Sequence, residues 1–218
     1  MHRDQLVELY PQLFHMACAG SWAAIKSHGL WTTQQIVETS AGAFERSVLI
    51  ERRPRSLTAN HPTLGTVTIR DQAPLRLQFL EGCLTDMSVE QWLAILNNRV
   101  FFWLHPAKLN RLLDAQRYRT FEQDVLVIDT KSILDAHEEK VRLSPINSGA
   151  TLYPNAPPRG SDTFATIDGY PYTDRRRTRT VVEAVTELAV VDGVHDIRDH
   201  VIRIERRRGS EVLDQHSV

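Results

Sequence analysis

The sequence has little of what marks several specialised protein classes. It contains only two cysteines, Cys18 and Cys83, in 218 residues, which excludes a disulfide framework and gives too few thiols for a cysteine zinc site. The formal net charge is −1, so attraction to nucleic acid or membrane would need a local patch. No apolar run approaches the roughly 20 residues that span a bilayer, and no apolar signal-peptide stretch follows Met1. We therefore expect a cytoplasmic protein without a membrane partner.

Short signatures of common enzyme sites are also missing. There is no G-x-G-x-x-G or G-x-x-x-x-G-K-[ST] for nucleotides, and no G-x-S-x-G nucleophile turn. His137-Glu138 begins like a zinc-protease helix, but Val141 occupies the place of the second histidine. The nine histidines include no pair spaced i, i+4, so we expect no metal.

What is present fits one globular α+β domain. Hydrophobic residues make up 42% of the chain and charged residues 24%, which is ordinary for a folded domain. Short apolar segments with strand patterns alternate with short segments that begin with helix-capping residues. We expect the domain to cover residues 1–206, with a charged C-terminal tail over 207–218. The expected strands are residues 12–17, 67–69, 100–104, 125–128, 141–143, 185–191 and 201–204.

Two regions look irregular. Residues 54–65 contain two prolines, Asn60 and Gly65, and are predicted to be a loop. Residues 144–180 are rich in proline and arginine, and a loop of that length is usually functional or disordered.

Three residues on or beside the predicted strands are candidates for chemistry. His15 lies inside an apolar strand, where it is either a core histidine bonded to backbone or a donor aimed into a cleft. Arg70 follows one strand and Arg99 precedes another. Each is either a solvated surface residue or a bidentate ligand for phosphate.

A carboxylate and a turn add to this set. Glu187 opens an apolar strand and is either an exposed edge charge or a catalytic group, with Glu183 as a weaker competitor. The segment 144–149 gathers Ser144, Asn147, Ser148 and Gly149 in one turn. Such a turn either binds an anion through backbone N–H groups or is a plain Asx turn.

A basic run in the long loop is the candidate for nucleic-acid binding. Aromatic side chains beside arginines can stack on bases while the arginines neutralise phosphates, although charge runs are more often solvated faces. The residues concerned are Tyr170, Tyr172, Arg175, Arg176, Arg177 and Arg179.

Taken in order, these segments resemble an ADP-ribosyltransferase of the DarT type. The resemblance covers residues 13–30, the strand from Arg99 to Trp103 with Pro106 beyond it, and the strand that Glu187 opens. The chain also resembles a poorly characterised bacterial family that shares residues 69–72, the strand 99–103, and residues 144–149 and 158–160. Residues 105–180 match DarT poorly, and Ser21 and Lys26 stand in the region where DarT enzymes place an Asn and a Gln for NAD.

The resemblance implies a split, mainly antiparallel β-sheet flanked by short helices, and an enzyme that transfers ADP-ribose from NAD to a base of DNA or RNA. Glu187 would stabilise the oxocarbenium-like charge on the ribose, with Arg70 or Arg99 as the catalytic arginine holding the pyrophosphate. His15 and the 144–149 turn would contact NAD. His15, Arg99 and Glu187 would border one cleft, and the loss of the Glu187 charge would barely change stability. A role as toxin or in defence, with an antitoxin or hydrolase counterpart, follows from the same resemblance.

Two other functions remain open. An RNA 2′-phosphotransferase resembles the same fold but relies on paired histidines and arginines, of which only His15 is well placed. A non-catalytic module that binds nucleic acid or protein would keep the fold alone.

Overall fold

The computed structural model describes residues 1–217 and contains a seven-stranded sheet with the order β6-β7-β4-β1-β5-β8-β9. Every neighbouring pair in it is antiparallel. The strands are β1 (Gln12–Cys18), β4 (Arg99–Trp103), β5 (Glu122–Asp129), β6 (Val141–Ser144), β7 (Glu187–Val191), β8 (Val201–Arg208) and β9 (Glu211–Ser217). A separate hairpin contains β2 (Leu57–His61) and β3 (Gly65–Ile69). The predicted α+β class with a mainly antiparallel sheet is confirmed.

The sheet is weakly joined between β1 and β4. These strands pair at one position, Phe14 opposite Trp103, whereas β1 pairs with β5 along its whole length from Gln12 to Cys18. The sheet therefore consists of two ladders that meet at a narrow seam, β6-β7-β4 on one side and β1-β5-β8-β9 on the other.

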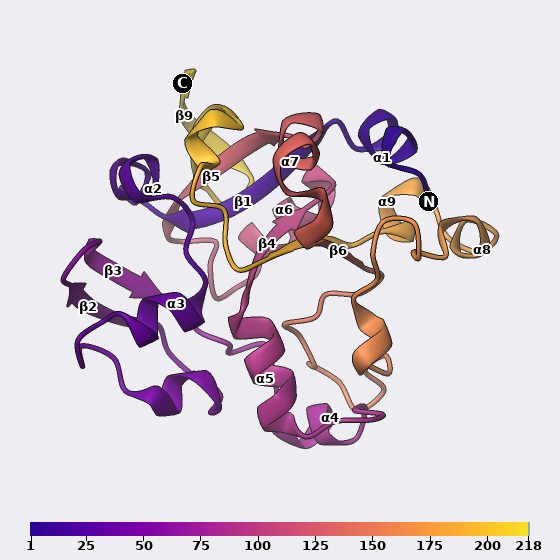
Figure 1. Cartoon of the computed structure of the whole chain (residues 1–218), viewed down its shortest axis with the longest axis horizontal. Coiled ribbons are helices and arrows are strands. Elements are labelled where there is room, and N and C mark those ends of the chain that lie inside the picture. The colour runs from indigo at the N-terminus through magenta and orange to yellow at the C-terminus, as the bar shows by residue number, and fades with distance from the viewer. Residues whose placement is uncertain (218) are drawn as a thin grey trace.

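Helices cover both faces of the sheet (Figure 1). One face packs on α1 and α7 in the largest core cluster, and the other packs on α6 in one cluster and on α4 and α5 in another. The α-helices are α1 (Arg3–Leu9), α2 (Trp22–His28), α3 (Thr33–Glu38), α4 (Leu77–Glu81), α5 (Val89–Asn97), α6 (Pro106–Leu113), α7 (Thr130–His137), α8 (Tyr172–Arg176) and α9 (Val181–Ala184). Short 3₁₀ turns are η1 (Arg46–Leu49), η2 (Glu138–Lys140), η3 (Ser161–Thr163) and η4 (Ile197–Asp199).

Capping chemistry accounts for several helix starts. Thr32 and Ser88 each form a capping box with a glutamine three residues later, at the heads of α3 and α5. Asp129 caps α7 by accepting from the Ser132 N–H, and Pro106 occupies the first turn of α6. At the end of α2, Gly29 has φ +87°. A Cβ there would lie 2.4 Å from the His195 backbone, so only glycine fits.

The structure corrects three expectations about local structure. Residues 57–61, within the predicted loop 54–65, form strand β2, which pairs with β3. Residues 211–217 of the predicted tail form β9, which extends the sheet beside β8. Residues 144–180 contain η3 and α8 and form bridges to Leu75, Leu84 and Leu143, so this segment is packed onto the domain. No helix within residues 1–217 has the length and apolar character to cross a membrane.

Candidate active site at Glu187

Glu187 is the first residue of β7, which lies between β6 and β4 in the sheet. It stands opposite Ser144 of β6 and Trp103 of β4. Its exposure is only 4%, because strands flank it on both sides. The interpretation as an exposed edge charge is therefore wrong.

Ser148 holds the buried carboxylate. Its backbone N–H donates to Glu187 Oε2 over 3.1 Å and its hydroxyl donates to the same oxygen over 2.7 Å. Within residues 1–217, Oε1 accepts no hydrogen bond. One carboxylate oxygen is thus fixed and the other is available.

The environment makes the charged form of Glu187 costly. Burial raises the pKa of Glu187 to about 7, against the opposing effects of the Ser148 hydrogen bonds and the Arg159 charge. The group therefore titrates near neutral pH. The expectation that its charge hardly affects stability assumed a solvated carboxylate; because Glu187 is buried, we predict instead that ionising it lowers stability.

Arg159 is the nearby cation, and sequence reasoning gave it no role of its own. It is 1% exposed, donates from Nη1 to the Ser148 carbonyl over 3.0 Å, and lies 5.8 Å from the centre of the Trp92 ring. Its Nη2 has no hydrogen-bond partner in the described chain. Arg159 thus supports the residue that holds Glu187, and burial lowers its own pKa.

The 144–149 turn binds an anion, and that anion is the protein's own carboxylate. Three of its N–H groups have partners within the protein: Ile146 donates to the Ser144 hydroxyl, Ser148 to Glu187, and Gly149 to Asn147 Oδ1 over 3.2 Å. The last of these is an Asx turn. The turn therefore holds the Glu187 carboxylate and contains an Asx turn, while its contact with NAD stays a prediction.

His15 lies on the other face of the sheet. Directly opposed residues of an antiparallel pair share a face, so Glu187 shares one with Trp103 and with Phe14, and His15 points the opposite way. Its Nδ1 is 2.9 Å from the Phe101 carbonyl. Burial, with a smaller effect of the Arg70 charge, lowers the pKa of His15 to about 4. The expectation of a single cleft with Glu187 is wrong, and His15 is the backbone-bonded histidine of the first interpretation.

The two candidate arginines occupy different places. Arg99 stands opposite Val191, four residues along β4 from Trp103, which puts its Cα roughly 14 Å from that end of the strand. It donates to the Ile95 carbonyl and lies 4.8 Å over the Phe164 ring. Arg99 therefore lies at the opposite end of β4 from the position that pairs with Glu187.

Arg70 follows β3 and reaches the seam of the sheet. Its Nη1 is 3.4 Å from the Met16 carbonyl of β1, and its guanidinium lies 5.2 Å over the Tyr118 ring. Arg70 thus reaches β1, which is two strands from β7 in the sheet order, whereas Arg99 lies at the far end of β4 from Trp103.

The structure separates the predicted basic and aromatic cluster. Tyr170 and Tyr172 are 3% and 6% exposed, and the Tyr170 hydroxyl donates to the Ala184 carbonyl. Their predicted role in stacking on bases is therefore wrong, because the rings belong to the main core. Arg175 is half-buried and donates to the Ala184 and Pro145 carbonyls. The exposed members of the run are Arg176, Arg177 and Arg179.

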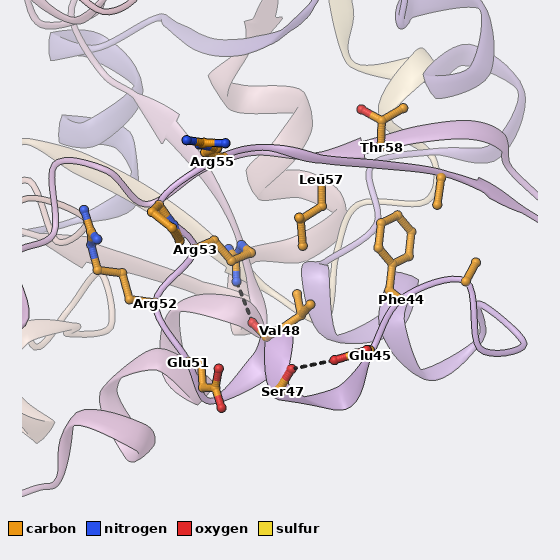
Figure 2. Close-up of a pocket in the computed structure, with 13 residues that line it drawn as sticks. Phe44, Glu45, Ser47, Val48, Glu51, Arg52, Arg53, Arg55, Leu57 and Thr58 are labelled. Atoms are coloured by element: carbon orange, nitrogen blue, oxygen red, sulfur yellow. Dashed lines mark hydrogen bonds between the residues drawn. The ribbon is translucent and has the colours of Figure 1, made fainter.

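A cavity of about 510 Å³ lies between η1 and the start of β2 (Figure 2). Phe44, Val48 and Leu57 contribute apolar surface, and Arg52 and Arg53 line it with positive charge. Its volume is in the range of small-molecule sites. None of the lining residues was predicted as a site residue, because residues 54–65 resemble a plain loop in the sequence.

Arg53 connects this cavity to Arg70. Its guanidinium donates to the Arg70, Val48 and Asn97 oxygens, the last over 3.0 Å. Burial lowers the pKa of Arg53 to about 10, which leaves it charged at neutral pH. Arg53 thus links the cavity to the backbone of Arg70, and Glu45 and Glu51 also line the cavity.

Comparison with known proteins gives a family but no described activity. A family model described as a family of unknown function (DUF7002) matches residues 11–201. A search of curated proteins finds no match.

Proposed function

The chain belongs to this family of unknown function, and from its site we propose that it cleaves NAD and transfers ADP-ribose to a nucleic acid, with Glu187 as the catalytic carboxylate. Breaking the nicotinamide–ribose bond builds positive charge on the ribose carbon, as in glycoside hydrolysis. A fixed carboxylate beside that carbon stabilises the charge.

The arrangement of Glu187 is the observation that carries this proposal. Ser148 fixes Oε2 and leaves Oε1 for the ribose. A burial-raised pKa of about 7 gives the carboxylate a strong tendency to take up positive charge, either a proton or an oxocarbenium-like ribose. A carboxylate needed only for packing would gain nothing from an unpaired oxygen.

The arginine assigned to NAD in this proposal is Arg70 rather than Arg99. Arg70 reaches the seam beside β1, and the Arg52–Arg53 cavity adjoins it. Paired cationic side chains suit a pyrophosphate. His15, which faces the other way, has no part in it.

The acceptor proposed is a base of DNA or RNA, which must be unpaired or extruded to reach Glu187. Exposed Arg176, Arg177 and Arg179 supply local positive charge on a chain of net charge −1. An antitoxin or a hydrolase that removes the modification is the expected counterpart, as the DarT resemblance implies.

The test is nicotinamide release from NAD in the presence of single-stranded DNA, RNA or cell lysate, with mass spectrometry of the acceptors. Glu187→Gln keeps the size of the side chain but removes its charge, and should lower the rate by on the order of 10²–10³. Glu183→Gln is the matched control, because Glu183 is exposed and lies four residues earlier. Full activity of Glu187→Gln, or loss of activity in Glu183→Gln alone, contradicts the assignment.

One observation favours a second function, a non-catalytic binding module. Glu187 is only 4% exposed, so NAD reaches it only if residues around the 144–149 turn move. If the wild-type protein leaves NAD intact with all three acceptors yet binds DNA or RNA, the binding module replaces the transferase.

A further inference from the structure

Two histidines and an aspartate converge where α7 ends and the segment after β7 crosses it. His137 is the last residue of α7, while Asp196 and His200 flank the η4 turn. One possible ligand atom from each residue lies within 4.8 Å of the other two. His137 and Asp196 are 59 residues apart, which is why the sequence around His137 showed no metal motif.

His200 is oriented as a metal-binding histidine is. Its Nδ1 lies 2.6 Å from the Ser132 hydroxyl, and metal-ligating histidines use their second nitrogen in the same way. Its Nε2 is buried, points into the cluster, and makes no hydrogen bond in the described chain. The side chain is 6% exposed. Asp196 Oδ2 lies 3.3 Å from this buried nitrogen without hydrogen-bond geometry, so the nitrogen faces a second possible metal ligand.

The other two residues complete a set of three ligands. His137 Nε2 is 2.7 Å from Asp196 Oδ1, and His200 Nε2 is 3.3 Å from Asp196 Oδ2. The rings of His137 and His200 are 5.6 Å apart at 80°, so their Nε2 atoms converge without stacking. Ligands about 2.0–2.1 Å from a tetrahedral ion are roughly 3.4 Å from one another, so small side-chain shifts would admit an ion.

We propose that His137, Asp196 and His200 bind a divalent transition-metal ion of the zinc class. Two imidazoles and one carboxylate suit zinc and its neighbours rather than calcium or magnesium, which prefer oxygen ligands. This proposal departs from the expectation that the chain binds no metal, which stays a prediction until the titration below is done.

The ion would fasten the segment after β7 to α7. Glu187 begins β7 and the cluster follows its other end, so the two sites are separated by the length of the strand. The metal site thus does not depend on the proposed transferase activity. The Asp196 side chain is 42% exposed, so this side of the cluster faces solvent. A water molecule can therefore occupy the fourth coordination position of the ion.

The test is titration of the whole chain, first stripped with a chelator, with Zn²⁺ and separately with Co²⁺, Fe²⁺ and Mn²⁺. We expect one Zn²⁺ per chain, a visible Co²⁺ spectrum of the tetrahedral type, and a higher melting temperature with metal. His200→Ala and Asp196→Asn should each weaken binding by roughly 100-fold or more, and Ser132→Ala by about 10-fold, because it only orients a ligand.

His195→Ala is the matched control, since His195 is exposed, precedes Asp196 and contacts Trp31 instead of the cluster. It should bind Zn²⁺ as the wild type does. Asp196→Asn keeps the size of a partly exposed side chain, so we expect this variant to fold. Circular dichroism can verify that it does. Equal Zn²⁺ affinity in wild type and Asp196→Asn, or equal losses in His195→Ala and His200→Ala, overturns the proposal.

Discussion

Two buried glutamates in the same sheet have opposite surroundings. Glu205 of β8 is 3% exposed, and its two oxygens accept from Arg203 Nε over 2.8 Å and from Arg207 Nε over 2.7 Å. Glu187 of β7 is 4% exposed and receives only the two neutral donors of Ser148. The two carboxylates are thus equally buried, but only Glu205 accepts hydrogen bonds from arginines. Glu187 is held in place by neutral donors and has no direct ion pair.

The difference lies in how the nearby arginines use their N–H groups. Arg203 and Arg207 sit on the same strand as Glu205 and direct their donors to it. Arg159 directs its Nη1 to the Ser148 carbonyl and its Nε to the Pro157 carbonyl, so it stabilises Glu187 only through its charge. Full pairing suits a structural residue, while incomplete pairing leaves a carboxylate able to react.

The largest expected effect on stability is at the paired site. Glu205→Ala leaves Arg207 buried without its counterion, which should lower the free energy of unfolding by about 3–5 kcal/mol. Urea denaturation at neutral pH measures this change. A loss below about 1 kcal/mol would mean that the ion pair is not buried in solution.

The next effect is the pH dependence of the free energy of unfolding that Glu187 causes. Burial raises the pKa of Glu187 from its ordinary 4.5 to about 7, so between these pH values the folded protein binds more protons than the unfolded chain. The contribution of Glu187 to stability is therefore largest below pH 4.5 and falls as pH rises to 7, by about 3 kcal/mol in all.

Denaturation of wild type and Glu187→Gln across pH 4–8 isolates this contribution. The stability of the wild type relative to Glu187→Gln should decline over that interval. A flat difference for Glu187→Gln would show that its carboxylate is solvated.

Ser148→Ala should have a smaller effect. It removes the hydroxyl donor to Glu187 Oε2, and a hydrogen bond to a charged group is worth about 1.5–3 kcal/mol. Because the hydroxyl favours the charged form, the loss of stability should be greater at pH 8 than at pH 5.

Ser144→Ala is the control for that experiment. Ser144 is equally buried, but its hydroxyl bonds to Ile146 and not to Glu187. Its cost should be the same at both pH values. A similar pH dependence in the two variants would remove Ser148 from the role of holding Glu187.

The smallest effect on stability is expected in the basic run. Changing exposed Arg176, Arg177 and Arg179 together to Ala should alter the free energy of unfolding by no more than about 0.5 kcal/mol per residue. It should weaken binding of single-stranded DNA and flatten its salt dependence. Arg175→Ala, which loses its bonds to two carbonyls, should instead destabilise the fold.

Fluorescence anisotropy at several salt concentrations measures the affinity of the wild type and of these variants for single-stranded DNA. An unchanged affinity and salt slope in the triple variant would show that the three arginines form a solvated face.

Local chemistry explains which features the sequence could predict. The capping residues Thr32, Ser88 and Asp129 act on N–H groups three residues away, so helix starts of this kind follow from the local sequence alone. Strand β2 was missed because its Thr58, Asn60 and flanking prolines resemble a loop, and only pairing with β3 makes it a strand.

The site was harder to predict because its geometry depends on distant pairing. Glu187 could be singled out by its place at the start of an apolar strand. Its burial depends on β6 and β4 flanking it, and the orientation of His15 depends on one register position between β1 and β4. Tyr170 and Tyr172 precede a basic run, yet their burial follows from packing against the core, which composition cannot reveal.

The seam between β1 and β4 also bears on synthesis of the chain. The two ladders that meet there draw on interleaved segments: the chain passes from one to the other between β1 and β4, β4 and β5, β5 and β6, and β7 and β8. On the ribosome, neither ladder can be completed before the last quarter of the chain emerges. Until β8 arrives, the apolar strand β5 has an open edge, which is a site for pairing with another chain. Nascent chains that stall before residue 201 should therefore be the species most prone to aggregate.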